Sequence, residues 1–382
     1  MKNIYSIIGI LFLTLTAQAQ DPKPTIFDGQ LMLLSPALTG EIEGDYIMQL
    51  GVQQRNQWFD AINDYYNYSA VTLESTLPIC FRDFGRISFS PGLSYLQERF
   101  PIDRSQPRMF SQRLGLSTAA RIQLAKGFYA AVGFEYELLQ RSIKTTDALQ
   151  FGSQYDGMGG FDSTLPSLET AINTANLRSG IKSDLATGIA IGFGAKHIGF
   201  RIGGAIHHLT RPVLSLLGNP NEDEARISHR YTAYYRLKAD FGWDKYSNKV
   251  ATGAGQLYGA FIAQGRGIWQ VNQGAEVGVF SKGLHYVAFG AGVRLTNDQF
   301  SSENLWTDTY FSIRWSYESF TIVMASDFAH SPFSKLANDN TATAIEFNLN
   351  YRFAKGGSGK CGVHCPKFSG RFKRPIGNMY RY

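Results

Sequence analysis

Two cysteines and a histidine lie close together near the C-terminus, in the segment 360–367, KCGVHCPK. Thiolates and imidazoles are zinc ligands, but a structural zinc site takes four, and Cys361, His364 and Cys365 offer three. In an oxidising compartment a disulfide is the more usual outcome for neighbouring cysteines. The chain has a third cysteine, Cys80. The pairing therefore stays open between a small Cys361–Cys365 loop and a bridge from either residue to Cys80.

The basic charge of the chain is concentrated in the same C-terminal tail, 354–382. The tail holds seven Lys or Arg and no acid; with Lys2 also removed, the total of 37 basic residues falls to 29, against 31 acidic ones. A basic segment interleaved with aromatic rings predicts docking on a partner protein, and a solvated, disordered tail is the alternative. The residues expected to carry the docking are Lys360, Cys361, His364, Cys365, Lys367, Phe368 and Phe372.

Catalytic motifs are absent from the sequence. It contains no nucleophile elbow, no HExxH and no P-loop, so we predict neither an enzyme nor a cofactor or metal site. The pair His207-His208 falls on an expected strand, where neighbouring side chains face opposite sides and cannot bind one ion. Charged residues on inward positions are expected to pair inside a barrel. They are Glu135, Glu137, Arg236, Lys238, Glu346 and Arg352.

The N-terminus predicts export. Lys2, an apolar run over 7–15 and Ala17-Gln18-Ala19 form a signal peptide, residues 1–19. The remaining sequence has no apolar run near the roughly 20 residues of a membrane helix. An exported chain with 39 Gly, 20 Tyr and 27 Phe is typical of a transmembrane β-barrel, in which lipid-facing and lumen-facing residues alternate.

The stretch Thr341–Phe353 has the clearest alternation. Ile345, Phe347 and Leu349 fall on one face and Glu346 and Asn348 on the other, as the two-residue period of a strand requires. The stretch 228–243 repeats this pattern. We predict an all-β, antiparallel, up-and-down barrel of about fourteen strands over 46–353, with twelve or sixteen as alternatives.

The connections predict which end of the barrel faces which compartment. Long loops are expected at 144–178 and 211–226, and short turns at 126–127, 194–196, 282–283 and 319. Because long loops are extracellular in such barrels, both termini are predicted to be periplasmic, in the outer membrane. We also predict a turn over Pro78–Gly85, and an edge position for the strand that contains Pro91. The expected strands are 46–58, 66–76, 86–98, 110–124, 128–143, 184–193, 197–209, 228–243, 257–263, 268–281, 284–296, 309–318, 320–328 and 341–353.

Residues 20–45 precede the first strand and do not alternate. Three prolines and an apolar patch at 31–34 indicate a periplasmic strap or a plug rather than a strand. Whether the lumen is open or plugged stays undecided at this level.

Two spaced N-terminal motifs resemble a known family. They are Leu34-Ser35-Pro36-Ala37-Leu38-Thr39-Gly40 and, at the end of the first strand, Gln54-Arg55-Asn56-Gln57-Trp58. With the exported start and the Cys365-Pro366-Lys367-Phe368 ending, the chain resembles the PorP/SprF family, outer-membrane barrels of the type IX secretion system of Bacteroidota. Ser35 stands where the family usually has Asn.

The resemblance implies a non-enzymatic role in secretion and, in gliding species, in adhesin export and attachment. It implies three kinds of partner: outer-membrane lipids, a secreted type IX substrate or adhesin, and the periplasmic ring and motor components. We expect the substrate at the extracellular loops and the periplasmic components at the tail. Nucleic acid is not an expected partner in this compartment.

Two other function classes fit parts of the sequence. An outer-membrane porin or hydrophobic-solute channel would use the charged lumen, although it has no obvious use for 29 residues after the closing strand. A soluble β-sandwich is disfavoured by the outward aromatic residues.

Overall fold

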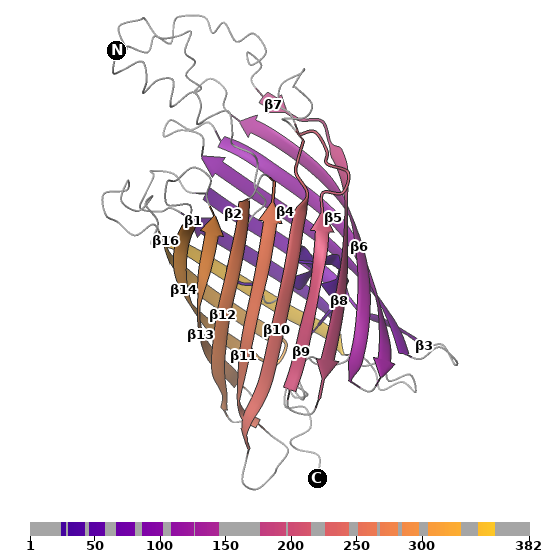
Figure 1. Ribbon diagram of the computed structural model, residues 1–382, viewed down its shortest axis with the longest axis vertical. Coiled ribbons are helices and arrows are strands. Elements are labelled where there is room, and N and C mark those ends of the chain that lie inside the picture. Colours follow the sequence, from indigo (N-terminus) through magenta and orange to yellow (C-terminus); the bar gives the residue numbers. More distant parts are fainter. Residues whose placement is uncertain are drawn as a thin grey trace, which may run out of the picture.

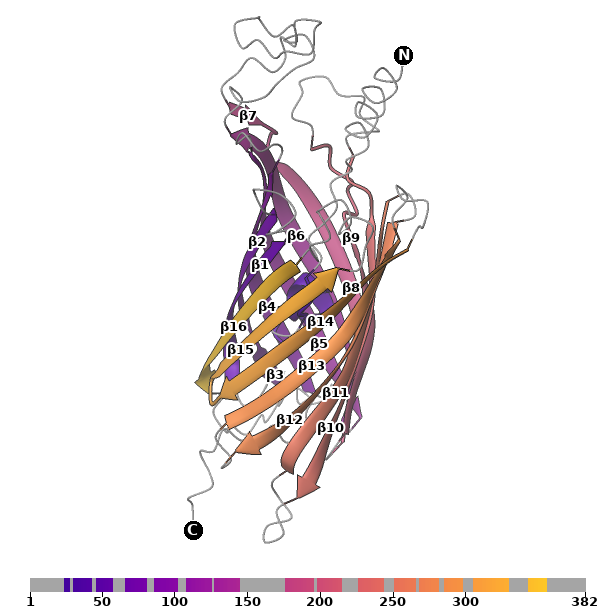
Figure 2. The same cartoon turned by 90° about the vertical axis from the view of Figure 1, so that its left-hand side faces the viewer.

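The strands of the chain form one closed antiparallel barrel in the computed structural model (Figures 1 and 2). The structure describes residues 24–27, 30–42, 46–57, 66–80, 86–101, 108–125, 127–144, 176–195, 198–214, 226–243, 251–265, 268–281, 285–297, 305–329 and 343–355. The strands are β1 Tyr46–Gln57, β2 Tyr66–Ser75, β3 Leu77–Cys80, β4 Arg86–Pro101, β5 Arg108–Ala125, β6 Phe128–Lys144, β7 Asn176–Arg178, β8 Lys182–Gly194, β9 Ile198–His207, β10 Arg230–Trp243, β11 Ala251–Gln264, β12 Ile268–Ser281, β13 His285–Asn297, β14 Leu305–Tyr317, β15 Phe320–Ala329 and β16 Thr343–Lys355.

The sixteen strand segments form a wall of fourteen strands, because β2 with β3, and β7 with β8, are each one interrupted strand. β2 and β3 pair with β4 in one register on both sides of Thr76, with Glu74 opposite Gly92 and Leu77 opposite Phe89. β7 and β8 both pair with β6, and the register shifts by one residue between them. Each strand neighbours the next in sequence, and β1 pairs with β16 to close the ring. The prediction of a fourteen-stranded up-and-down barrel is confirmed.

The faces of the strands follow the predicted alternation. In β16, Ile345 and Phe347 are exposed on the outer surface, whereas Glu346 and Asn348 are completely buried on the inner one. The same holds in β10, where Tyr231 and Leu237 are exposed and Arg236 is buried. Large apolar side chains are exposed along the outside of almost every strand, which is the surface that a bilayer requires.

Aromatic rings gather at one rim of this outer surface. His285 stacks on Tyr317 with ring centroids 4.7 Å apart, and Phe320 packs on Tyr351 at 4.6 Å. Aromatic residues at the two rims of a barrel mark the membrane–water interfaces. This rim carries the short connections 126–127, 195–197, 282–284 and 318–319, together with the start of β1 and the end of β16. The longest connections, 145–175 and 208–229, leave the opposite rim, which we call the long-connection rim.

Four details differ from the sequence predictions. The strand after β2 continues to Cys80, so Pro78–Cys80 is not part of a turn. Residues 176–178 form β7, because the end of the predicted loop pairs with β6. β11 begins at Ala251 rather than at Leu257, which shortens the connection before it. Pro91 is not in an edge strand: a closed ring has no edge, and Pro91 pairs with Thr118 on one side and lies beside the Thr76 interruption on the other.

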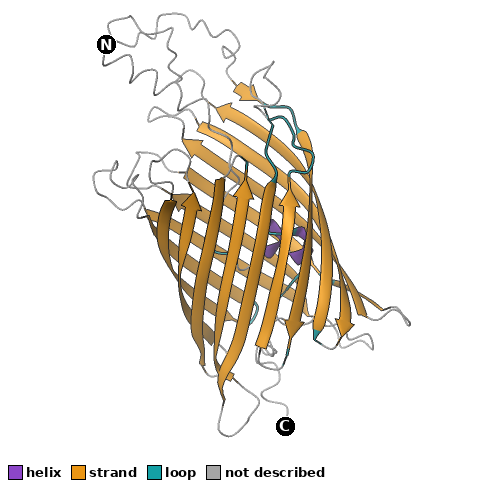
Figure 3. Ribbon diagram, viewed as in Figure 1, coloured by secondary structure: helices purple, strands orange, loops and turns teal. Residues whose placement is uncertain are grey.

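The helices in the described part of the chain are two short 3-10 turns inside the barrel, η1 Leu31–Leu33 and η2 Pro36–Leu38 (Figure 3). None of the described helices is long and apolar enough to cross a membrane. Ser35 caps η2 by accepting a hydrogen bond from the Ala37 N–H at 3.3 Å, and Pro36 suits the first helical position. We call the described residues 24–27 and 30–42 the plug.

Candidate functional site: the plugged lumen

The plug is part of the interior of the barrel. Leu34, Ala37 and Leu38 form an apolar cluster with wall residues of four strands. The wall partners are Ala131 of β6, Ala190 of β8, Tyr234 of β10 and Ala260 of β11. Ala37 and Leu38 are fully buried. The lumen at this level is therefore filled by the chain's own N-terminal segment, and its apolar contacts are those of a packed core.

The first part of the plug binds two carboxylates of the closing strands. Glu346 on β16 accepts hydrogen bonds from the Thr25 N–H at 2.7 Å and from the Ile26 N–H at 2.9 Å. Thr25 Oγ1 donates to Asp327 Oδ2 on β15 at 2.7 Å. The residues that these bonds join lie 302 to 321 positions apart in the sequence. They satisfy backbone donors that would otherwise be buried without partners, which is costly.

Arg55 on β1 joins the same carboxylates to the plug. Its guanidinium nitrogens lie 2.6 Å from Asp327 Oδ2, 2.9 Å from Glu346 Oε2 and 2.6 Å from Thr25 Oγ1. Arg55 is 1% exposed and Glu346 0%. Arg294 of β13 forms a further ion pair with Asp327. Charge-assisted, multidentate bonds of this kind fix geometry strongly, so this cluster holds Thr25 at one place on the wall.

The second part of the plug is seated on small residues of the wall. A Cβ added to Gly133 of β6 would lie closer than 3.0 Å to the backbone of Pro36 and Ala37. Gly188 of β8 leaves room for Ser35 in the same way. A glycine lets another segment approach its backbone closely, so Gly133 and Gly188 make room in the wall for η2 and its capping residue Ser35.

The end of the plug turns at Gly40, which has φ +70°. Its N–H donates to Glu74 Oε2 of β2 at 2.8 Å, and its carbonyl accepts from the Thr76 hydroxyl. A positive φ favours glycine, and a side chain here would also collide with Ser90. Just beyond it, Glu41 accepts from the Tyr129 hydroxyl at 3.0 Å and pairs with Arg201. The plug is thus tied to the wall at both ends.

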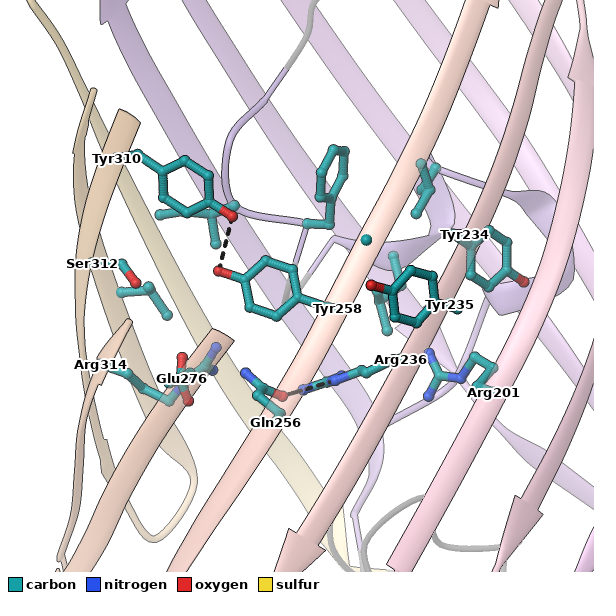
Figure 4. A pocket seen from close by; sticks show the side chains of 16 residues that line it. Arg201, Tyr234, Tyr235, Arg236, Gln256, Tyr258, Glu276, Tyr310, Ser312 and Arg314 are labelled. Atoms are coloured by element: carbon teal, nitrogen blue, oxygen red, sulfur yellow. Dashed lines mark hydrogen bonds and ion pairs between the residues drawn. The ribbon is translucent and has the colours of Figure 1, made fainter. Parts of the chain in front are cut away.

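A cavity of about 580 Å³ lies beside the plug, between it and the inner face of β9–β15 (Figure 4). Tyr258 and Tyr310 face each other across one end of it, with their hydroxyls 3.3 Å apart. At its lower side Arg236 donates to Gln256 Oε1 at 2.9 and 2.7 Å. Aromatic faces with a few fixed polar groups are suited to binding an amphipathic small molecule.

An ion pair also lines the cavity: Arg314 Nε donates to the two carboxylate oxygens of Glu276 at 2.9 and 3.0 Å. The lining offers a salt-bridged, aromatic wall.

The structure brings together most of the two N-terminal motifs. Pro36, Ala37 and Gly40 are plug residues, and Arg55 holds the start of the plug. Asn56 and Gln57 lie at the end of β1, where Asn67 donates a hydrogen bond to Asn56. Trp58 and the tail residues predicted to bind a partner, Lys360, Cys361, His364, Cys365, Lys367, Phe368 and Phe372, lie outside the described residues.

Two carboxylates bind the start of the plug, and only one of them was recognised in the sequence. Glu346 was predicted to point inward from its place in the alternation, and it does. Asp327 was not singled out, although it is buried on the inward face of β15, in alternation with the exposed Met324. A search for charged residues at inward positions of every strand would have found it.

The prediction that His207 and His208 face opposite sides is wrong. β9 ends at His207, and His208 has φ +61°, so the chain turns and both imidazoles are buried. His207 Nε2 lies 3.3 Å from the Leu34 carbonyl oxygen of the plug. His208 Nδ1 lies 2.5 Å from Asp184 Oδ2.

These features define a class: a membrane-spanning β-barrel whose lumen is closed by its own N-terminal segment. The chain matches no protein-family model and no curated protein. Among solved structures it is similar to other barrels, all at low identity. A Pseudomonas aeruginosa FadL homologue is 11% identical, with TM-score 0.45, covering 87% of this chain and 95% of that one.

Two further solved structures are similar to this chain over most of its length. The CymD monoaromatic hydrocarbon channel is 12% identical with TM-score 0.45, covering 86% of this chain and 94% of that one. BamA from Haemophilus ducreyi, lacking POTRA domains 1–3, is 6% identical with TM-score 0.41, covering 81% and 70%.

Proposed function

We propose that this protein is a non-enzymatic outer-membrane barrel of the type IX secretion system of Bacteroidota. It would assist export and cell-surface attachment of a partner protein, such as a gliding adhesin, that bears a type IX C-terminal domain. The two motifs that resemble the PorP/SprF family support this. Their residues are not scattered: Ser35, Pro36 and Gly40 shape and seat the plug, and Arg55 anchors its start.

The observation that carries the proposal is the filled lumen. Ala37 and Leu38 are completely buried among wall residues, and Thr25 is held by four charged side chains of the wall. A barrel of this size is too narrow for folded cargo, and the seated plug fills its lumen at this level. The protein therefore acts through its two rims, by contact with partners, rather than as a conduit.

The two rims suit different partners. Connections 145–175 and 208–229 supply a large surface at the long-connection rim, which we assign to the cell exterior and to the secreted partner. The start of β1 and the end of β16 lie at the other rim, so the basic tail that follows β16 leaves the barrel there. We assign that rim to the periplasm, and the tail to the ring and motor components of the apparatus.

Deleting Gly356–Tyr382 tests the tail, since the deletion begins after the last residue of β16. We expect an inserted, heat-modifiable barrel with reduced surface display of the partner and reduced co-purification of periplasmic components. A Cys361→Ser, Cys365→Ser variant is the matched control for loss of thiols alone. Normal display together with normal co-purification in the deletion strain would remove the tail's role.

A second function is favoured by one observation, the aromatic cavity of about 580 Å³ beside the plug. It fits a hydrophobic-solute channel in which the plug moves aside when a ligand arrives. Conductance and solute uptake in proteoliposomes separate the two functions. A large open current, or uptake of hydrophobic solutes by the purified barrel, would favour the channel over the secretion role.

A further inference from the structure

Three side chains of metal-binding types meet in the wall of the lumen. They are Glu137 of β6, Asp184 of β8 and His208, which directly follows β9. One ligand atom of each lies within 4.8 Å of the others. The three residues are 5%, 0% and 0% exposed. The carboxylates that bond the plug are different residues, Glu346, Asp327 and Glu74.

The fold, and not a local sequence motif, makes this cluster. Glu137 and Asp184 are directly opposite each other in the β6–β8 pairing, so both carboxylates point to the lumen side. β9 ends one residue before His208, and the left-handed backbone at His208 turns its imidazole towards the same place. A left-handed conformation is unfavourable for histidine, and here it is held by a bond to Asp184.

The cluster places two carboxylates side by side in a buried setting. Like charges directly opposite on neighbouring strands destabilise a sheet, and burial increases the cost of each charge. Arg113 Nη1 lies 3.8 Å from Glu137 Oε1, and His208 Nδ1 lies 2.5 Å from Asp184 Oδ2. A divalent cation bound between the two carboxylates would balance both charges at once and would take the neutral imidazole as its third ligand.

We propose that Glu137, Asp184 and His208 bind one Zn²⁺ ion. Imidazole nitrogen and carboxylate oxygen are the ligands that zinc takes at about 2.0–2.2 Å, and three protein ligands leave a position for water. Asp184 is held in place by other bonds: its Oδ1 accepts from Thr210 Oγ1 and from the Leu185 N–H, both at 2.7 Å. Such outer bonds are what orient metal-binding carboxylates. Asp184 Oδ2 lies 2.5 Å from His208 Nδ1, so the metal ion would replace the proton that these two atoms share.

The position of the site has a structural consequence. Glu137 also lines a cavity of about 610 Å³ that runs beside the plug. Glu137 and Asp184 lie four residues from Gly133 and Gly188, where the plug is seated, on the side of the long-connection rim. A zinc ion here would join β6 and β8 to the first residue of connection 208–229, and so hold the base of that connection.

The test uses the full chain in detergent with the tail thiols removed, as Cys361→Ser, Cys365→Ser, because the tail could also bind zinc. The protein is stripped with a chelator, titrated with Zn²⁺, and its metal content is measured by mass spectrometry. We expect one Zn²⁺ per chain. Glu137→Gln and His208→Gln should each weaken binding at least tenfold, since loss even of a supporting partner costs about 10–100-fold.

Glu137→Gln is the decisive variant, because it leaves the bonds of Asp184 with His208 and Thr210 in place and should fold. His207→Gln is the matched control: it removes an equally buried imidazole that lies against the plug carbonyl of Leu34, and it should bind zinc normally. Equal zinc content in Glu137→Gln and its parent would overturn the proposal. So would absence of zinc from the parent, or tighter binding of Mg²⁺ or Ca²⁺ than of Zn²⁺.

Discussion

Replacing Arg55 with methionine should release the plug without unfolding the barrel. Arg55 contributes three short bonds, to Asp327, to Glu346 and to the plug residue Thr25, and it is 1% exposed. Methionine keeps much of the apolar stem and removes the charge. Both carboxylates then lose a buried cation while the plug keeps water away from them.

The magnitude follows from what each carboxylate retains. Removing one partner of a buried ion pair costs about 3–5 kcal/mol. Here Glu346 keeps the Gln53 side chain at 2.6 Å and the Ile26 N–H, and Asp327 keeps Arg294. We therefore expect the lower limit, about 3 kcal/mol. When the plug leaves, water hydrates the carboxylates, so Arg55→Met destabilises the seated state much more than the unseated state. The ratio of seated to unseated plug should fall on the order of 100-fold.

Single-barrel conductance in planar bilayers measures that ratio. The parent protein should open rarely, and Arg55→Met should spend on the order of 100-fold more time in an open state. Arg314→Met is the matched control, since it breaks a buried pair with Glu276 between β14 and β12, away from Thr25. Heat-modifiable migration checks that both variants remain folded barrels.

Two results would refute the reasoning. If Arg55→Met is folded and stays as closed as the parent, the ion-pair cluster does not hold the plug. If Arg314→Met opens equally often, the openings report general loosening of the wall and not release of Thr25.

Three further changes have expected outcomes. Gly133→Ala places a Cβ against the backbone of Pro36 and should increase the open time in the same recordings while leaving the barrel folded. Leu38→Ala creates a cavity under a fully buried plug residue and should lower the free energy of unfolding by about 2–5 kcal/mol, measured in urea; an unchanged value would mean that the plug is loosely packed. Phe289→Lys on the outer face of β13, where the ring is 65% exposed, should cost about 2–4 kcal/mol if it lies at the bilayer midplane, with Phe289→Leu as control.

The barrel itself could be predicted from the sequence because its signal is local. The period of two in 228–243 and 341–353 predicts which side chains face lipid, and the described residues of both stretches have those faces. The interruptions between β2 and β3 and between β7 and β8 could not be predicted from this alternation. The register shift between β7 and β8 depends on how residues 179–181 pair with β6, which is a tertiary property.

The plug site was only partly predictable for the same reason. The 3-10 turn at Pro36 follows from a capping serine and a proline, which are local signals. The contact of Thr25 with Glu346 joins residues 321 positions apart and leaves no periodic trace. His208 is the clearest failure: alternation predicts that it faces the opposite side from His207, but the strand ends at His207 and the turn brings the ring inward.

The contacts of Thr25 and Arg55 also bear on how the barrel is assembled. They cross the seam between the first strand, β1, and the last two, β15 and β16. The segment that fills the lumen is made before any strand, yet its partners Asp327 and Glu346 are made last. Glu346 and Asp327 complete their hydrogen bonds only when Thr25 and Ile26 lie in the lumen, so the closing strands and the plug stabilise each other. A ring that closed without the plug would leave these two buried carboxylates without those donors, which is unfavourable.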